Sequence, residues 1–185
     1  MLYLTESDVR ALLPMRQAID LMQAAFERLA RGEAINQPRR RLILPTGSVL
    51  HYMAASDGNY FGAKVYSTNK LSGAHFLFLL YRASDGSPLS LIEANHLGQI
   101  RTGAVSGLAT KYLARPDAAT LGLIGSGFQA RSQFEAMLAV RPIRQANCGA
   151  EIRQKEVVSP QSIRSRFQSP LAPWKVRRKP CATLR

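Results

Sequence analysis

The feature that most constrains this chain is a short apolar run that leads directly into a glycine-rich turn, at residues 119–130. The spacing Gly125-x-Gly127-x-x-Ala130 is the G-x-G-x-x-A form of the dinucleotide-binding fingerprint. Gly125 permits a sharp turn, Gly127 has no side chain to block a pyrophosphate, and Ala130 lets the next helix pack close to the strand. Amide donors and the positive end of that helix dipole then face the phosphates. The stretch predicts a strand, a phosphate-binding turn and a helix.

The residues on either side of the turn distinguish this interpretation from an ordinary turn in an α/β protein. Leu121, Leu123 and Ile124 predict a buried strand before the turn. Residues 129–140 repeat apolar side chains at helical spacing, with Phe134 near the middle. Both flanks favour a dinucleotide-binding unit.

The chain before the turn predicts two helices and then a largely antiparallel sheet. Thr5-x-x-Asp8 resembles a helix-capping box. A second helix is expected to begin near Pro14 and to end at Gly32. Strands are expected at residues 41–44, 49–54, 60–67, 75–81 and 89–93. Because the segments between these strands are short, as in hairpins, most neighbouring strands are expected to be antiparallel.

A helix over residues 96–114 is expected next, and one of its faces is unusually small. Its small residues are Gly103, Ala104, Ser106, Gly107 and Ala109. A face of this kind lets another backbone approach closely. The alternative of a membrane-dimer motif is not favoured, because Arg101 and Lys111 interrupt the segment.

The net charge of +13 is concentrated at one end of the 185-residue chain. The last 40 residues hold nine of the 25 basic residues but two of the 12 acidic ones, and they also hold both cysteines and the only tryptophan. The basic clusters at residues 164–166 and 175–179 would permit contacts with nucleic-acid phosphates. Aromatic residues are too sparse there for a base-stacking platform, so nucleic-acid binding is kept only as an alternative.

Other classes of site have little support in the sequence. His51, His75 and His96 lie more than 20 residues apart, without the close pairing common in metal sites, so no metal is expected. Cys148 and Cys181 do not form a C-x-x-C pair. No stretch approaches the roughly 20 apolar residues of a membrane helix, and the N-terminus has no signal-peptide pattern. A cytoplasmic protein that does not enter a membrane is the expectation.

Four motifs occur in order along residues 1–145. They are Gln37-Pro38-Arg39-Arg40, Gly62-Ala63-Lys64, Arg101-Thr102-Gly103-Ala104 with its continuation to Leu113, and Gly125-Ser126-Gly127-Phe128-Gln129-Ala130. On these motifs the chain resembles the N-terminal part of the ornithine cyclodeaminase/mu-crystallin family. The resemblance implies an α/β fold, in which an α+β substrate and dimerisation domain precedes the beginning of a Rossmann-type dinucleotide-binding domain.

The resemblance also implies a chemistry and a set of partners. Members of the family transfer a hydride between NAD or NADP and the carbon next to the carboxylate of an amino or imino acid. Their reactions include ornithine cyclisation to proline with release of ammonia, ketimine or pyrroline-carboxylate reduction and alanine dehydrogenation. A homodimer is implied as well. The residues implied to bind the cofactor are Arg101, Gly125, Ser126, Gly127, Phe128, Gln129 and Ala130.

Three basic residues are implied to bind the substrate, namely Arg40, Lys64 and Arg101, and Lys64 is also the catalytic candidate. The planar fork of an arginine holds a carboxylate through two hydrogen bonds. Arg40 is alternatively part of a solvated basic edge, and Arg101 can equally contact the phosphates of the cofactor. Lys64 is either an edge-strand lysine that opposes aggregation or an active-site lysine whose pKa is lowered by partial burial.

The resemblance is expected to end near Gln145. Residues 143–152 contain no compact apolar run that would form the second parallel strand of a Rossmann domain, and the later aspartate of the cyclodeaminases has no counterpart. The expected domains are a substrate-binding and dimerisation domain at 1–115, a first β-α unit at 116–145, and a basic tail at 146–185 that is disordered or out of frame. A truncated family member without activity of its own is the leading hypothesis. A chain completed by a separate polypeptide is an alternative.

Overall fold

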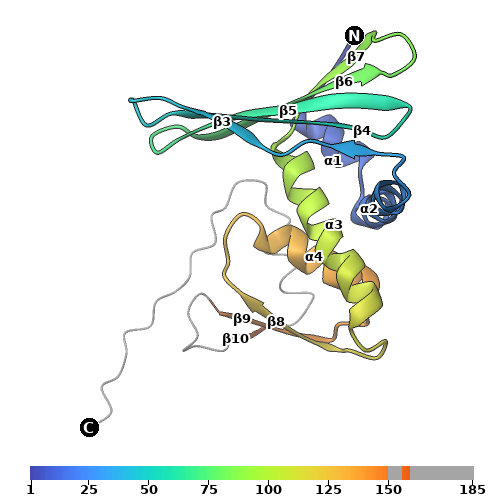
Figure 1. The fold of residues 1–185 in the computed structure, drawn as a ribbon. Coiled ribbons are helices and arrows are strands. Elements are labelled where there is room, and N and C mark those ends of the chain that lie inside the picture. The colour runs from blue at the N-terminus through green and yellow to red at the C-terminus, as the bar shows by residue number, and fades with distance from the viewer. Residues whose placement is uncertain (150–155, 159–185) are drawn as a thin grey trace.

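The computed structural model describes residues 1–149 and 156–158. It contains two sheets, and the helix α3 (Asn95–Leu113) runs from the larger sheet to the smaller one (Figure 1). Helices α1 (Glu6–Leu12) and α2 (Met15–Ala30) lie on the same side of the larger sheet as α3. The mixed α/β architecture expected from the sequence is confirmed.

The larger sheet has seven strands in the order β1-β7-β6-β5-β4-β2, and β3 pairs with β4 beside this path. The strands are β1 (Leu2–Leu4), β2 (Ile35–Asn36), β3 (Arg40–Ile43), β4 (Val49–Ser56), β5 (Tyr60–Asn69), β6 (Gly73–Arg82) and β7 (Pro88–Glu93). All pairs are antiparallel except β1 with β7. The prediction of a largely antiparallel sheet is confirmed, whereas the short strands β1 and β2 were not predicted.

Local sequence signals set the helix ends near the N-terminus. The Thr5 hydroxyl accepts a hydrogen bond from the amide of Asp8, and the Asp8 carboxylate accepts one from the amide of Thr5, so the predicted capping box forms. After α2, Gly32 adopts a positive φ of 74° just past the C-cap, as a terminating glycine does. The start of α3 has no such local signal, and its Asn95 and His96 amides donate instead to the carboxylate of Glu6.

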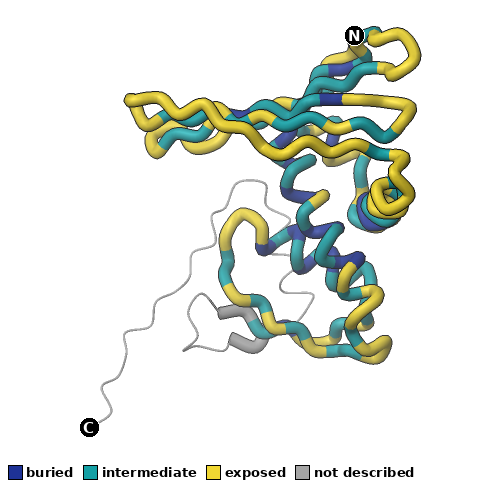
Figure 2. Tube along the Cα trace, in the orientation of Figure 1, coloured by how far each residue is buried: buried dark blue, intermediate teal, exposed yellow. Residues whose placement is uncertain are grey.

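The predicted small face of α3 packs against two other helices. A Cβ atom on Gly103 would overlap the main-chain carbonyl of Ser132 in α4 (Ala130–Val140). A Cβ atom on Gly107 would lie 3.0 Å from Ile19 Cδ1 and 3.1 Å from Ala136 Cβ. Buried residues therefore gather where α2, α3 and α4 meet, as the dark segments of Figure 2 show.

The smaller sheet has three strands in the order β10-β9-β8. They are β8 (Thr120–Ile124), β9 (Gln145–Gly149) and β10 (Glu156–Val158). β8 and β9 are parallel and are connected through α4, which forms a β-α-β unit. The expectation that no second parallel strand follows residue 143 was wrong. A short strand needs backbone pairing and few inward side chains, and here Ala146 packs with Phe134.

The exposure of β8 differs in part from the prediction that Leu121, Leu123 and Ile124 form a buried strand. Leu121 and Leu123 point toward the Phe134 side of α4 and are partly buried. Ile124 is 84% exposed, because the described residues cover only one face of this strand. The prediction was right for the two leucines and wrong for the isoleucine.

Candidate functional site

Lys64 lies on the helix-covered face of the larger sheet, in a strand with neighbours on both sides. Its pairing partners are Met53 on β4 and Phe78 on β6. The Lys64 ammonium is 4.7 Å from the centre of the Phe76 ring and 5.2 Å from that of Tyr66. It also faces Gly98 in the first turn of α3, where a Cβ atom would be 3.7 Å from Nζ. The interpretation of Lys64 as an edge-strand residue is therefore excluded.

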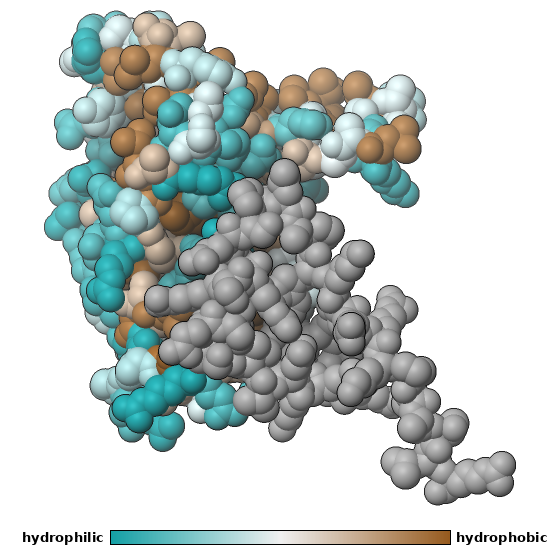
Figure 3. All heavy atoms as spheres, turned by 180° about the vertical axis from the view of Figure 1, so that it is seen from behind, coloured by the Kyte–Doolittle hydropathy of each residue, from teal (hydrophilic) through white to brown (hydrophobic). Residues whose placement is uncertain are grey.

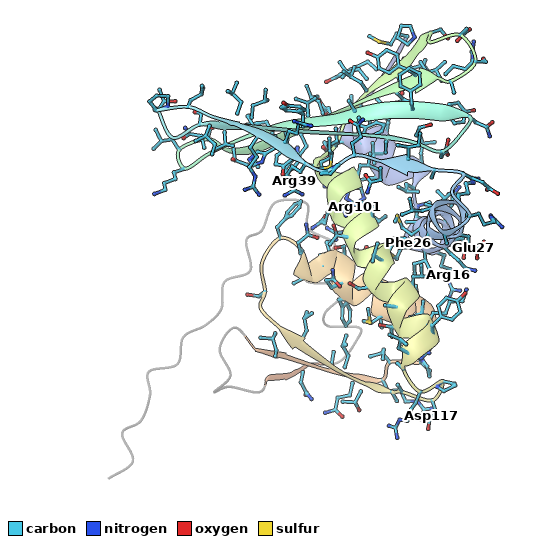
Figure 4. All side chains as sticks on the ribbon, in the orientation of Figure 1. Arg16, Phe26, Glu27, Arg39, Arg101 and Asp117 are labelled. Carbon is cyan, nitrogen blue, oxygen red and sulfur yellow. The ribbon has the colours of Figure 1, made fainter. Side chains whose placement is uncertain are left out.

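Positive charge accumulates around Lys64. Partial burial lowers the pKa of its ammonium, and the nearby Arg101 and then Arg39 lower this pKa further. None of the ion pairs formed within the described part of the chain includes these three residues. Figure 4 shows Arg39 and Arg101 at the junction between the larger sheet and α3. Three cations without an acidic partner form a site suited to an anion.

The structure brings Arg39, rather than Arg40, to this cluster. Arg40 pairs with Tyr52, whose partner on β5 is Val65, so Arg40 belongs to the sheet face opposite Lys64. The Arg39 guanidinium lies 5.8 Å from the centre of the Tyr66 ring, on the Lys64 side. Arg39 was not among the site residues expected from the sequence. No signal in the sequence distinguishes the two arginines, because their faces depend on the register between β3 and β4.

Stacked aromatic rings continue the cluster across the sheet. His51 stacks on Tyr66 with ring centres 4.3 Å apart, and Tyr66 stacks on Phe76 at 4.5 Å. Nε2 of His51 lies 3.0 Å from the hydroxyl of Thr68. Burial, followed by the charges of Arg41 and Arg39, lowers the pKa of His51 and favours its neutral form. The rings provide a flat, uncharged surface beside the three cations.

The glycine-rich turn has the geometry that a phosphate group requires. Gly125 has a positive φ of 92°, which L-residues with side chains rarely adopt. A Cβ atom on Gly127 would have no neighbour within 4 Å, so the space beside it is open. Helix α4 begins directly after Gln129, with no side-chain cap and no acidic residue in its first turn. Its first amides therefore face no competing negative group, and the turn fits a dinucleotide pyrophosphate.

The predicted cofactor residues thus lie together at the start of α4, with Ser126 partly buried and Phe128 60% exposed. Arg101 is separate from them on α3 and neighbours Lys64. A residue that the sequence analysis missed connects the two regions: Gln99 is 5% exposed, and its Nε2 donates a hydrogen bond to the carbonyl of Phe128. Its position two residues before Arg101 was the only signal available.

Neither a metal-binding cluster nor a membrane-spanning helix is found in the described ranges. Residues 1–149 and 156–158 contain no group of three or more His, Cys, Asp or Glu side chains placed to hold a metal ion. No helix in these ranges is both long enough and apolar enough to cross a membrane.

Known proteins with similar sequences and folds share this arrangement of elements. A Δ1-pyrroline-2-carboxylate reductase from Bacillus cereus is 32% identical, over 95% of this chain and 57% of its own length. The Thermococcus litoralis Δ1-pyrroline-2-carboxylate reductase, solved with NADH and L-proline, matches with a TM-score of 0.75 and 34% identity, over 80% of this chain and 49% of that one. An archaeal alanine dehydrogenase dimer with bound NAD matches with a TM-score of 0.74 and 32% identity, over 80% of this chain and 48% of that one.

The present chain spans about half the length of these relatives. The family description that matches is that of ornithine cyclodeaminase/mu-crystallin, and the match covers residues 1–156. The resemblance therefore extends beyond Gln145, where the sequence analysis expected it to end, and it includes β9. Most of the predicted tail at 146–185 lies outside the described residues. With the fold, the four motifs and the match over 1–156 in agreement, the chain belongs to the ornithine cyclodeaminase/mu-crystallin family.

Proposed function

We propose that this chain forms the substrate-binding part, and the beginning of the cofactor-binding part, of an NAD(P)-dependent oxidoreductase acting on a small amino or imino acid. A cyclic imino acid of the Δ1-pyrroline-2-carboxylate type is the preferred substrate, because the reductases named above act on it. The observation that carries the proposal is the convergence of Arg39, Lys64 and Arg101 without an acidic partner among the described ion pairs. Arg40 was the implied ligand, and its place on the other sheet face favours Arg39 for this role.

The three cations suit the carboxylate of such a substrate. An arginine fork can hold a carboxylate through two parallel hydrogen bonds, and an ammonium adds a third charged donor. The flat ring of a cyclic imino acid would lie against the stacked surface of Tyr66 and His51. Because the pKa of Lys64 is lowered, Lys64 releases its proton more readily than an exposed lysine does. It can therefore hold or donate a proton at the substrate nitrogen.

The glycine-rich turn suits the cofactor. The amides around residues 125–130 and the start of α4 would hold the pyrophosphate. Arg101, which lies near Lys64, would contact either the phosphates or the substrate carboxylate. The nicotinamide, when bound, supplies or accepts the hydride.

A homodimer is the second part of the proposal. The face of the larger sheet opposite the helices carries large apolar side chains that are 37% to 54% exposed, namely Leu42, Leu50, Tyr52, Phe61 and Leu77. Figure 3 shows apolar side chains gathered along this sheet. An apolar face of this kind is typical of a protein interface, and the similar archaeal alanine dehydrogenase is a dimer. We expect two copies to meet through these faces.

Binding of pyrrole-2-carboxylate, a flat and stable analogue of the imino acid, tests the substrate assignment. Lys64→Met should weaken this binding about tenfold or more, which corresponds to about 1.4 kcal/mol. Lys70→Met is the matched control, because Lys70 lies in the exposed turn between β5 and β6. Calorimetric titration of both variants measures the difference. Equal dissociation constants for the two variants would exclude Lys64 from the substrate site.

A further inference from the structure

A side-chain hydrogen bond joins α3 to the loop that is proposed to hold the cofactor. Gln99 is 5% exposed, and its Nε2 donates a hydrogen bond to the Phe128 carbonyl. Among the described residues, this is the only hydrogen bond that reaches residues 125–129 from outside the segment 125–140. The Phe128 side chain is 60% exposed, so apolar packing contributes little to fixing the loop.

The hydrogen bonds inside the segment stabilise the start of α4 but do not orient the loop toward α3. The Ala130 amide donates to the Gly127 carbonyl at 3.0 Å, and the Ser132 hydroxyl donates to the Gln129 carbonyl at 3.0 Å. In a planar trans peptide the N–H points opposite to the C=O. Because the Phe128 carbonyl is held toward α3, the Gln129 amide must point away from α3. The hydrogen bond from Gln99 therefore sets the direction of the Gln129 N–H, which is one of the donors in the turn.

The segment of α3 that carries Gln99 is closely packed against neighbouring residues. Gly103, four residues along α3, packs directly on the Ser132 carbonyl of α4, so the two helices are closely packed at this point. Gly98, the residue before Gln99, faces the ammonium of Lys64 at 3.7 Å, measured from an added Cβ atom. Gln99 thus links a helix that contacts the anion site to the loop that is proposed to contact the cofactor.

We infer that Gln99 is a positioning residue, which orients the peptide between Phe128 and Gln129 and thereby prepares the loop for a nucleotide pyrophosphate. The inference rests on the proposed function of the loop in binding NAD(P). It assigns to Gln99 no contact with substrate or cofactor, and its effect is transmitted through the Phe128 carbonyl.

The test compares Gln99→Met with Gln133→Met. Methionine has nearly the length of glutamine but no N–H donor. Gln133 is a suitable control, because its Nε2 also joins α4 to α3, by a 3.4 Å hydrogen bond to the Thr102 carbonyl, without contacting the loop. Three quantities are measured on the whole chain: backbone ¹⁵N order parameters of residues 127–129 without ligand, the Kd for NADH, and the Kd for pyrrole-2-carboxylate.

For Gln99→Met we expect the order parameters of residues 127–129 to fall from about 0.85, typical of a rigid backbone, to below about 0.6. We also expect the Kd for NADH to rise about tenfold. The Kd for pyrrole-2-carboxylate should match that of Gln133→Met. This split between the two ligands is not expected from a general loss of stability.

Two results would overturn the inference: order parameters that are the same in both variants, or losses of affinity in Gln99→Met that are equal for both ligands. A third outcome is that the loop becomes more mobile in Gln99→Met but the wild-type chain does not bind NADH. This outcome would support the positioning role and contradict the proposed function. The two failures are therefore distinguishable.

Discussion

Arg10 donates a hydrogen bond from Nη1 to Nδ1 of His96 over 3.0 Å, between α1 and the first turn of α3. Because a guanidinium has no acceptor, Nδ1 must accept, and the proton of the neutral imidazole is on Nε2. Burial, followed by the charge of Arg10, lowers the pKa of His96, while Gln99, Glu6 and Glu135 act in the opposite direction. His96 is therefore neutral in the folded chain at pH values where an exposed histidine is protonated.

This relationship predicts a loss of stability in mild acid. Below the unfolded pKa of about 6.5 the unfolded chain binds a proton at His96 that the folded chain does not bind. The free energy of unfolding should therefore fall as the pH decreases from about 6.5 toward the lowered pKa, by at most about 1.4 kcal/mol per pH unit. His96→Gln should remove this contribution. Urea denaturation between about pH 5 and 8 measures how the free energy of unfolding depends on pH. His75→Gln is the control, because His75 is exposed. An unchanged slope in His96→Gln would contradict the assignment.

The contact between α3 and α4 predicts different costs for two glycine substitutions in one helix. Gly103→Ala should lower the free energy of unfolding by about 1–3 kcal/mol, because its Cβ would meet the rigid Ser132 carbonyl. Gly107→Ala should cost less. Its nearest neighbours are side chains, and alanine is about 1 kcal/mol better than glycine in a helix. Chemical denaturation measures the free energy of unfolding of both variants. If Gly107→Ala costs as much as Gly103→Ala or more, the two helices move apart easily at Gly103.

Adjacent arginines offer the sharpest test of the anion site. Arg39→Met should weaken pyrrole-2-carboxylate binding about tenfold, because Arg39 lies on the Lys64 face of the sheet. Arg40→Met should leave it within about twofold of the wild type, since Arg40 pairs with Tyr52 on the other face. The two variants have the same composition and net charge. A loss of binding in Arg40→Met alone would restore the ligand implied by the sequence motif.

The open face of the larger sheet predicts the oligomeric state. Leu77→Lys should convert the proposed dimer into a monomer at micromolar concentration, because it places a charge within the apolar face. Leu71→Lys should leave the dimer intact, since Leu71 is 98% exposed in the turn before β6. Analytical ultracentrifugation measures the mass of each variant. A monomeric wild-type chain, or a dimeric Leu77→Lys variant, would contradict an interface at this face.

Short-range features of the fold were predictable from the sequence. The capping box of Thr5 and Asp8, the terminating Gly32 and the positive φ of Gly125 each depend on residues within a few positions of one another. The small face of α3 was also predictable, because the absence of bulky side chains is itself what permits close packing. The order of the four motifs along the chain indicated the family, and the match over residues 1–156 confirms it.

The tertiary structure decided which of these residues meet. The choice between Arg39 and Arg40 follows from the register of β3 on β4, and a shift of one residue would exchange their faces. The Glu6 carboxylate caps α3 from 89 and 90 positions earlier in the chain. The hydrogen bond between Gln99 and Phe128 joins residues that are 29 positions apart. The parallel strand β9 forms despite a polar sequence, because β8 provides its backbone partners. Local sequence fixes backbone conformation over one or two turns, whereas burial and pairing are properties of the whole packed chain.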